Sequence, residues 1–510
     1  MKLFKKLAAA LVATMLVMTM IGGGALSAFA DGTPGTAKKY TVTLTPNTQD
    51  KGTHTYEAYQ IFKGELSGSG TQRILSNIQW GDGITGAGQT ALAGSGTAAA
   101  YAASLEGLDA AGAEALAKQL SQYLASPTAT GTASIELPAG YYLIMDKADS
   151  PSGTPSSKTK FILAVVGDVT VKVKSSVPSV EKKVQDINDT SGTTLTNLQD
   201  SADYDIGDEV PYTVTATIGD GIDNYPAYSF QFVDDMTVGL TLLPTSWKIM
   251  AGGASGTDIS ELFTLTSGTG NASGSTLWTW AATNLKGKSG TAITDGMKIV
   301  LTYKCELNEN AVIGAKGNLN EVKLNFDNNP NASGQGKPSG STPWDKNIVF
   351  TYKTVFNKVE PDGSGTKPLA GADFKLEKQL SDGSWVEVTR KETTNSGTTF
   401  EFLGLDDGKY KLTETQTPTG YNSIDPIEFT ITAEHEIVSD DPALTSLLGA
   451  GGAEFTMSLA SGTISSDVVN QSGATLPETG GIGTTIFYVL GAILVLGGGV
   501  LLVTRRRMAA

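Results

Sequence analysis

Three polar residues in the middle of the sequence stand where a buried face is expected: Lys182, Asp234 and Asn320. Successive side chains of a strand point to opposite faces, so residues two apart share a face. Each of the three lies two positions from an apolar residue in an alternating segment, and each should therefore point into a core. A lone buried lysine or carboxylate costs several kcal/mol unless it is paired or neutralised. These positions need a chemical explanation.

An intramolecular isopeptide bond would remove both charges. Burial lowers the pKa of a lysine and raises that of an acid, which leaves a neutral amine beside a protonated carboxyl. The amine of Lys182 can then attack the side-chain carbonyl of Asn320, while Asp234 polarises that carbonyl and shuttles protons as ammonia leaves. We predict a Lys182–Asn320 bond with Asp234 as the autocatalytic acid.

A second set of such residues lies near the C-terminus: Lys358, Glu414 and Asn470. Each shares a face with the apolar residue two positions before it. We predict a Lys358–Asn470 bond with Glu414 as the acid. For both sets the alternative is a surface lysine, a solvated acid and a turn asparagine. The first part of the chain contains no comparable set, so we expect no bond there.

Neighbouring residues of the same types fit the pattern less well. Lys183 and Asp235 should point to the opposite faces of their strands. Asn318 has the parity of Asn320, but no apolar residue follows it two positions later. We therefore expect these three residues to stay outside the reaction.

Strands are the elements expected to position these side chains. The chain has 510 residues, among them 60 glycines, with abundant threonine and few helical patterns. Short strands with Gly, Asn and Pro turns are typical of immunoglobulin-like β-sandwiches. The alanine-rich segment 98–125 predicts one amphipathic helix. We predict an all-β fold of tandem sandwich domains with a helical insertion in the first domain.

Both ends of the chain carry export and membrane signals. Lysines precede the apolar stretch 7–21, and Ala28-Phe29-Ala30 is typical of a signal peptidase site. The uncharged run 482–503 is long enough to cross a bilayer as a transmembrane helix, and the arginines at 505–507 should keep its far end in the cytoplasm. The body of the protein is therefore expected to be extracellular.

These features predict an order of segments along the chain. The predicted segments are a signal peptide at 1–30, an N-terminal domain at 31–178, a middle isopeptide-forming domain at 179–353, a C-terminal domain at 354–471 and a sorting signal at 472–510.

Composition excludes several classes of function. The net charge is −15, and the charged residues of the signal peptide 1–30 and of the C-terminal stretch 482–510 are all basic. Without these two stretches the mature chain is still more acidic, so nucleic acid is not expected as a partner. Cys305 is the only cysteine, which excludes an internal disulfide. His54 and His435 stand far apart without ligands at metal spacing, so we expect both at the surface, no metal and no cofactor. No hydrolase arrangement of residues is found, so we predict no enzyme.

The segment Leu476-Pro477-Glu478-Thr479-Gly480 resembles the sorting signal of Gram-positive sortases. The resemblance implies that a sortase cysteine attacks the carbonyl of Thr479, releases Gly480 with the membrane tail and passes the acyl group to an amine. The alternative is an ordinary single-span protein.

Further motifs resemble a family of surface proteins. Lys358-Val359-Glu360, the segment 368–374 and the segment 414–421 resemble the CnaB-like domains of Gram-positive pilins and adhesins. Residues 181–184, 234–240 and 320–322 resemble the middle domain of sortase-assembled backbone pilins. The resemblance implies a shaft subunit of a wall-anchored pilus, with a sortase, other pilin subunits and peptidoglycan as partners. The alternative is a monomeric wall-anchored adhesin that binds a host protein or glycan.

Polymerisation in that family requires an acceptor lysine, often in a Tyr-Pro-Lys-Asn motif. The equivalent segment here, 171–176, lacks the Tyr and Pro. Lys172 and Lys174 should both be exposed, and Lys174 lies nearer the domain boundary. We predict Lys174 as the acceptor; the alternative is that both are simply solvated strand lysines.

Overall fold

The computed structural model describes residues 38–68, 73–175, 177–194, 198–330, 339–473 and 487–499. The predicted signal peptide and the pentapeptide 476–480 lie outside these residues. Of the predicted span, residues 487–499 are described and form a helix. Among the described helices, none has the length and hydropathy of a membrane span.

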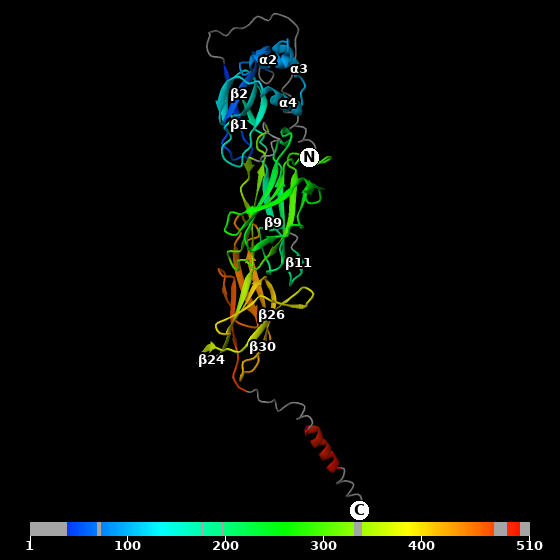
Figure 1. Cartoon of the computed structure of the whole chain (residues 1–510), viewed down its shortest axis with the longest axis vertical. Coiled ribbons are helices and arrows are strands. Elements are labelled where there is room, and N and C mark those ends of the chain that lie inside the picture. The colour runs from blue at the N-terminus through cyan, green and yellow to red at the C-terminus, as the bar shows by residue number, and fades with distance from the viewer. Residues whose placement is uncertain are drawn as a thin grey trace, which may run out of the picture. The chain divides into compact units, whose positions relative to one another are not determined.

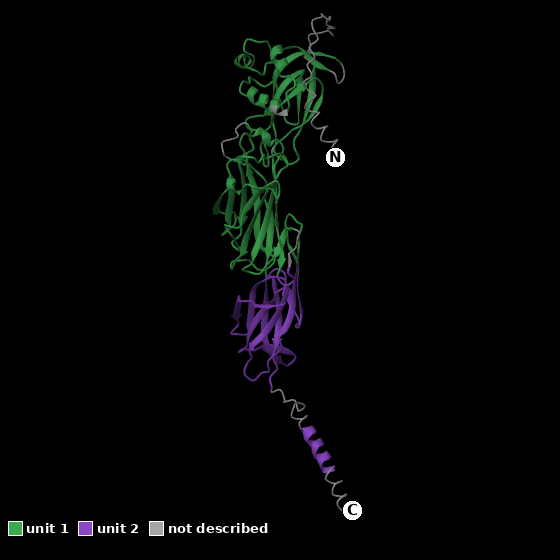
Figure 2. Cartoon of the chain, turned by 90° about the vertical axis from the view of Figure 1, so that its right-hand side faces the viewer, with its two compact units in different colours: residues 1–188, 193–351, 434–446 green, residues 189–192, 352–433, 447–510 purple. Residues whose placement is uncertain are grey.

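Two compact units make up the chain (Figure 2). Unit 1 contains residues 1–188, 193–351 and 434–446, and unit 2 contains residues 189–192, 352–433 and 447–510.

The first part of unit 1 has two small sheets with strand orders β5-β1-β8 and β3-β2-β6-β7, where β4 also pairs with β2. Three helices lie close to these strands (Figure 1). The elements are β1 Lys39–Thr45, β2 Tyr56–Ser67, β3 Ile74–Trp80, α2 Gly86–Ala93, α3 Ala98–Ser104, α4 Ala110–Leu120, β4 Ala129–Gly131, β5 Ser134–Pro138, β6 Gly140–Asp146, β7 Lys160–Val165 and β8 Val169–Lys172.

The prediction of one helix over 98–125 is wrong, because α3 ends at Ser104 and a separate helix, α4, begins at Ala110. The side chain of Thr97 accepts a hydrogen bond from Ala100 N and caps α3. The side chain of Asp109 does the same for α4 through Gly112 N. Gly107, between the two helices, has a φ of 79° that disfavours other residues. The apolar residues of this segment have helical spacing, but the two N-caps divide the segment into two helices.

A β-sandwich forms the second part of unit 1. One sheet has the order β17-β16-β20-β13-β9 with β15 on β20, and the other has the order β12-β23-β21-β14-β19-β18 with β22 on β21. Buried apolar residues of both sheets form one cluster between them. The elements are β9 Ser179–Val184, β10 Ile187–Asn188, β11 Thr193–Thr194, β12 Ser201–Asp203, β13 Glu209–Thr217, β14 Phe230–Met236, β15 Leu240–Leu242, β16 Lys248–Ala251, β17 Thr257–Asp258, β18 Thr264–Thr269, β19 Thr276–Ala282, β20 Lys298–Leu307, β21 Asn318–Phe326, β22 Gly340–Ser341, β23 Asp345–Phe350 and the 3-10 turns Ile222–Asn224 and Ser260–Leu262.

Unit 2 is a second sandwich. Its sheets have the orders β28-β29-β24-β34-β33, with β25 on β24, and β27-β26-β30-β31-β32. The first strand, β24, pairs in parallel with the last, β34. The elements are β24 Tyr352–Asp362, β25 Gly365–Pro368, β26 Asp373–Gln379, β27 Trp385–Glu387, β28 Lys391–Thr394, β29 Thr399–Leu405, β30 Gly408–Gln416, β31 Ile427–His435, β32 Leu444–Gly451, β33 Thr456–Ser458 and β34 Thr463–Val469.

These sheets confirm the predicted all-β fold of tandem sandwiches with a helical insertion. Burial alternates residue by residue along β13 and β21, as the period of a strand with one buried face requires. The three-domain boundaries stay a prediction. Within unit 1, the buried apolar residues of the first part and of the sandwich form separate clusters.

Candidate functional site

Lys182, Asp234 and Asn320 meet inside the sandwich of unit 1. Lys182 comes from β9 in one sheet, and the other two come from the adjacent strands β14 and β21 of the facing sheet. The lysine Nζ lies 2.6 Å from Asp234 Oδ2 and 2.7 Å from Asn320 Oδ1. All three residues are 0% exposed. The amine therefore crosses the core and contacts both predicted partners.

Burial governs the charges in this cluster. It lowers the pKa of Lys182, and the opposing attraction of Asp234 does not restore it. Burial likewise raises the pKa of Asp234, against the effect of Lys182. Both shifts favour the uncharged forms, an amine and a carboxylic acid. A nucleophile and an acid are thus held beside an amide carbonyl.

Tyr303 is a fourth member of the cluster that the sequence analysis missed. Its hydroxyl donates to Asp234 Oδ2 at 2.8 Å and accepts from Asn320 Nδ2 at 3.0 Å. The rings of Tyr303 and Tyr212 lie 5.5 and 5.1 Å from the Lys182 Nζ. Tyr303 alternates with Leu301 and Cys305 on the buried face of β20, a pattern that marks it as a core residue. Its spacing in the sequence does not indicate which polar group it binds.

Lys358, Glu414 and Asn470 meet in the same way in unit 2. The Lys358 Nζ donates to Asn470 Oδ1 and lies 3.3 Å from Glu414 Oε1. Asn470 Nδ2 donates to the same glutamate oxygen at 2.9 Å. The side chains of Lys358 and Glu414 are fully buried, and Asn470 is 0% exposed. The predicted residues therefore lie in contact.

The two clusters differ in the strands they connect. Lys358 lies opposite Val468 in the β24–β34 pair, and Asn470 directly follows β34, so both belong to one sheet. Glu414 reaches them from β30 of the other sheet. Its Oε2 accepts from Thr417 Oγ1 at 2.9 Å, which fixes the carboxyl group. Burial lowers the pKa of Lys358 more than the attraction of Glu414 raises it.

The three neighbouring residues that we expected to stay outside the reaction have other partners. Lys183 Nζ donates to Asp200 Oδ1 at 2.7 Å. Asp235 Oδ2 accepts from the backbone N of Asn271 at 2.6 Å. Asn318 is buried but binds backbone groups of β23 and of the loop before β21. None of these contacts reaches the cluster of Lys182.

Lys174 is exposed two residues beyond the end of β8, and Lys172 is exposed as well. Lys174 lines a small cavity within unit 1 together with Lys158 and Lys160. Burial, with a smaller contribution from Lys118, lowers the pKa of Lys160 to about 8.

The expectation that the histidines lie at the surface is wrong. His54 is 5% exposed, and the side chain of His435 is 8% exposed. His54 Nδ1 lies 2.8 Å from Asp146 Oδ1, and its Nε2 lies 3.1 Å from Asp50 Oδ1. Both acids are buried. Spacing in the sequence did not indicate Asp146, which is 92 residues away, whereas Asp50 is only four residues before His54.

Comparisons with known proteins agree with this arrangement. Residues 353–442 match the prealbumin-like fold domain of the SpaA family, and residues 468–509 match the LPXTG cell wall anchor motif. The trypsin-resistant surface T6 protein of Streptococcus pyogenes serotype M6 is 25% identical over 401 residues, which cover 66% of this chain and 70% of that protein.

A solved structure supports the fold. The T6 backbone pilin of serotype M6 Streptococcus pyogenes, described as a modular three-domain structure, aligns with a TM-score of 0.53 and 17% identity over 86% of this chain and 100% of that one. This likeness concerns the fold alone, whereas the anchor motif concerns attachment to the cell wall and the sequence relative is a surface protein. Together, the SpaA-family domain, the LPXTG anchor motif and the likeness to T6 support the sortase-assembled backbone pilin that the sequence motifs predicted.

Proposed function

We propose that this protein is the shaft subunit of a covalent pilus on the cell wall. A sortase cleaves after Thr479 and joins its acyl group to a lysine of another subunit, and the base of the polymer is attached to peptidoglycan. The anchor motif matched over 468–509 carries this proposal, since it holds the cleavage site and the span that retains the precursor. The protein is a structural subunit and a sortase substrate, not an enzyme.

We further propose that each buried cluster forms one isopeptide bond. In unit 1 the Lys182 Nζ attacks Cγ of Asn320, and a C–N bond forms as the bond from Cγ to Nδ2 breaks. Asp234, held as the neutral acid, gives its proton to the leaving nitrogen, which departs as ammonia, and takes one from the attacking amine. The 2.6 Å and 2.7 Å contacts of the lysine support these roles. Each bond lowers the mass of the chain by about 17 Da, one ammonia.

Unit 2 supports the same reaction with Glu414 as the acid. Glu414 Oε1 contacts both the nucleophile and the leaving amide, at 3.3 Å from Lys358 Nζ and 2.9 Å from Asn470 Nδ2. One carboxyl oxygen can therefore accept the proton from the amine and deliver it to the nitrogen that leaves. The reaction occurs once and changes only the protein itself.

Lys174 is our proposed acceptor of the Thr479 acyl group. Its exposure and its position between the first part of unit 1 and the sandwich support the assignment. Co-expression with the pilin sortase should give ladders of covalent polymer on a denaturing gel of wall extracts. Lys174→Ala should abolish the ladder, and Lys172→Ala, on an equally exposed neighbour, should leave it intact.

Two outcomes would contradict parts of this proposal. Ladders that persist in Lys174→Ala would transfer the acceptor role to another lysine, with Lys160 as the next variant to test. A single band in the wild type would favour the alternative, a monomeric adhesin that binds a host protein or glycan. Three domains, at 31–178, 179–353 and 354–471, complete the proposed organisation; the modular structure described for the T6 backbone pilin supports them.

A further inference from the structure

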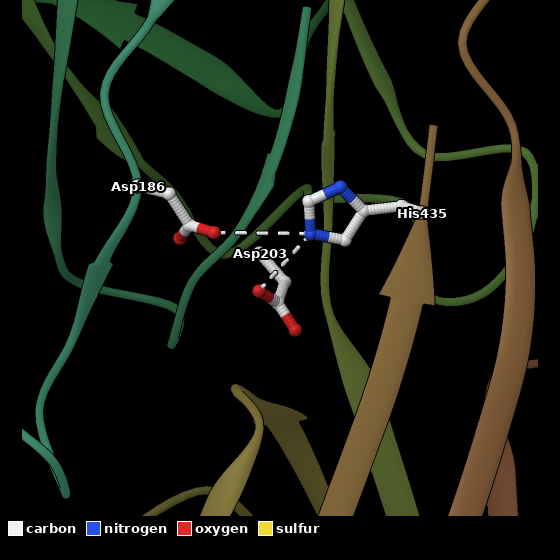
Figure 3. Close-up of side chains that lie close together, drawn as sticks. All are labelled: Asp186, Asp203 and His435. Carbon is white, nitrogen blue, oxygen red and sulfur yellow. Dashed lines mark ion pairs between the residues drawn. The ribbon is translucent and has the colours of Figure 1, made fainter. Parts of the chain in front are cut away.

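We infer that Asp186, Asp203 and His435 bind a divalent transition-metal ion of the zinc class. Asp186 follows β9, Asp203 ends β12 and His435 ends β31, and all three belong to unit 1 (Figure 3). Their ligand atoms lie within 4.8 Å of one another. Imidazole and carboxylate are ligands that zinc accepts. The sequence analysis predicted no metal because these residues are far apart in the chain.

Ser201 determines which nitrogen of His435 faces the two acids. The Ser201 hydroxyl donates its single proton to the carbonyl oxygen of Glu436 at 2.6 Å. It can therefore only accept from His435 Nδ1, which lies 2.8 Å away. The proton of the neutral ring is thus on Nδ1, and Nε2 presents its lone pair to Asp186 and Asp203. Metal-bound histidines are oriented by such a hydrogen bond on the other nitrogen.

The distances fit ligands around an ion better than a hydrogen bond. His435 Nε2 lies 3.8 Å from Asp186 Oδ2 and 3.6 Å from Asp203 Oδ1. Both are longer than the usual 2.7–3.2 Å of an N–H···O hydrogen bond. Two ligands about 2.1 Å from a tetrahedral zinc are about 3.4 Å apart, so each of the two His435–aspartate distances needs a contraction of only a few tenths of an ångström.

His54 provides the contrast within the same chain. Its two ring nitrogens face separate carboxylates at 2.8 and 3.1 Å, the arrangement of a charged imidazolium between two acids. In the proposed metal site, by contrast, Asp186 and Asp203 both face the same nitrogen of His435, Nε2. In the neutral tautomer Nε2 has no proton to donate to either acid, whereas one metal ion can bind all three groups.

The carboxyl group of Asp203 gives an independent indication. Asp203 is 4% exposed and points toward the His435 ring (Figure 3). Its Oδ2 has no hydrogen-bond partner among the described residues. A buried carboxylate oxygen without a partner is costly. Oδ1 is the oxygen 3.6 Å from His435 Nε2, so a cation bound by both oxygens of Asp203 would also satisfy Oδ2. Asp186 is held in place by Gln199 Nε2, which donates to its Oδ2 at 3.1 Å.

Calorimetric titration of the detergent-solubilised full chain with Zn²⁺ tests the site. We expect one equivalent to bind, and His435→Gln to weaken binding about tenfold or more. The chain has only two histidines, so His54→Gln is the matched control and should leave affinity unchanged. Co²⁺ added alone should give visible absorption bands in the wild type and in His54→Gln, but not in His435→Gln.

Asp186→Asn is the second variant, since its side chain is 14% exposed and the substitution keeps its shape. It should also weaken Zn²⁺ binding while the near-ultraviolet circular dichroism of the metal-free protein stays that of the wild type. Absence of Zn²⁺ binding, or equal affinity in wild type and His435→Gln, would overturn the inference. So would loss of binding in His54→Gln alone.

Discussion

Each buried lysine lies beside an acid that is placed to exchange protons with both the amine and the amide, as the proposed reaction requires. In unit 1, Asp234 contacts the amine directly but reaches Asn320 only through the hydroxyl of Tyr303. In unit 2, Glu414 Oε1 contacts both the amine and the amide. Removing the acid should therefore stop the reaction although the lysine and asparagine remain.

Intact mass measures this directly. The wild-type chain should be lighter than its sequence mass, after any processing, by two ammonia molecules, about 34 Da. Asp234→Ala should reduce the loss to about 17 Da, because only the bond of unit 2 can form. Asp235→Ala, at the neighbouring position outside the cluster, should keep the full loss. A full loss in Asp234→Ala would remove the acid from the mechanism.

His54 should make stability depend on pH. Burial lowers the pKa of His54, but hydrogen bonds and charge attraction from Asp146 and Asp50 outweigh it and raise the pKa to about 9. A raised pKa stabilises the fold fully below the unfolded value of about 6.5 and less as pH rises through 9. We expect a loss on the order of 2–3 kcal/mol between these limits.

Urea unfolding at pH 6, 8 and 10, compared between wild type and His54→Gln, isolates this effect. The comparison is needed because Lys160, whose pKa burial lowers to about 8, titrates in the same range with the opposite sign. The wild type should lose stability relative to the variant as pH rises. Parallel curves for the two proteins would show that His54 contributes no pH dependence.

Alternation in the sequence indicated which residues form the two buried lysine clusters because a strand has a period of two. The residues two positions before and after Lys182 are apolar, so Lys182 points to the buried face if the segment is a strand. Alternation could not predict which residues Tyr303 and His54 contact. Tyr303 meets Asp234 across 69 residues, and only the pairing of strands determines such contacts. Parity predicts the face of a residue but not its neighbour on another strand.

At the scale of elements, the two proposed bonds join different kinds of neighbours. The Lys182 bond would connect the two sheets of its sandwich, since β9 and β21 belong to different sheets. The Lys358 bond would connect adjacent parallel strands, β24 and β34, within one sheet. The strands and the presence of helix in the first part were predictable, whereas the ends of the helices were not, because these depend on single capping residues such as Asp109.

Loss of the second bond should destabilise unit 2. The bond would close a loop of 112 residues, which corresponds to about 4–5 kcal/mol if the entropy of a disulfide loop applies. Lys358→Met, which keeps the apolar stem, should lower the free energy of unfolding of unit 2 by about this amount in urea titrations.

Lys353→Ala is the control for this change. Lys353 lies on the same strand and forms a partly exposed ion pair with Glu401 at 2.6 Å, so its loss should cost less than about 1 kcal/mol. Equal effects of the two substitutions would mean that Lys358 contributes no covalent stabilisation.

For the whole molecule, the positions of the proposed bonds would determine which segments a pulling force can extend. Force entering unit 2 at β24 would cross from Lys358 to Asn470 and leave toward Thr479, so the loop between them would be shielded. In unit 1 the force would cross from Lys182 to Asn320. Residues 321–350 follow that bond and include β23, so they lie outside the closed loop.

Single-molecule stretching of the polymer should reveal this asymmetry. Residues 321–350 can extend by up to about 100 Å per subunit while both bonds stay intact, because an extended chain spans about 3.3–3.6 Å per residue. Lys358→Met should add a step of up to about 380 Å, as the 112 residues between Lys358 and Asn470 become free to unfold under load. Asp235→Ala, which leaves both clusters intact, should stretch like the wild type. If Lys358→Met shows no added step, then the bond does not carry the load in unit 2, and the covalent path to Thr479 must run through the strands themselves.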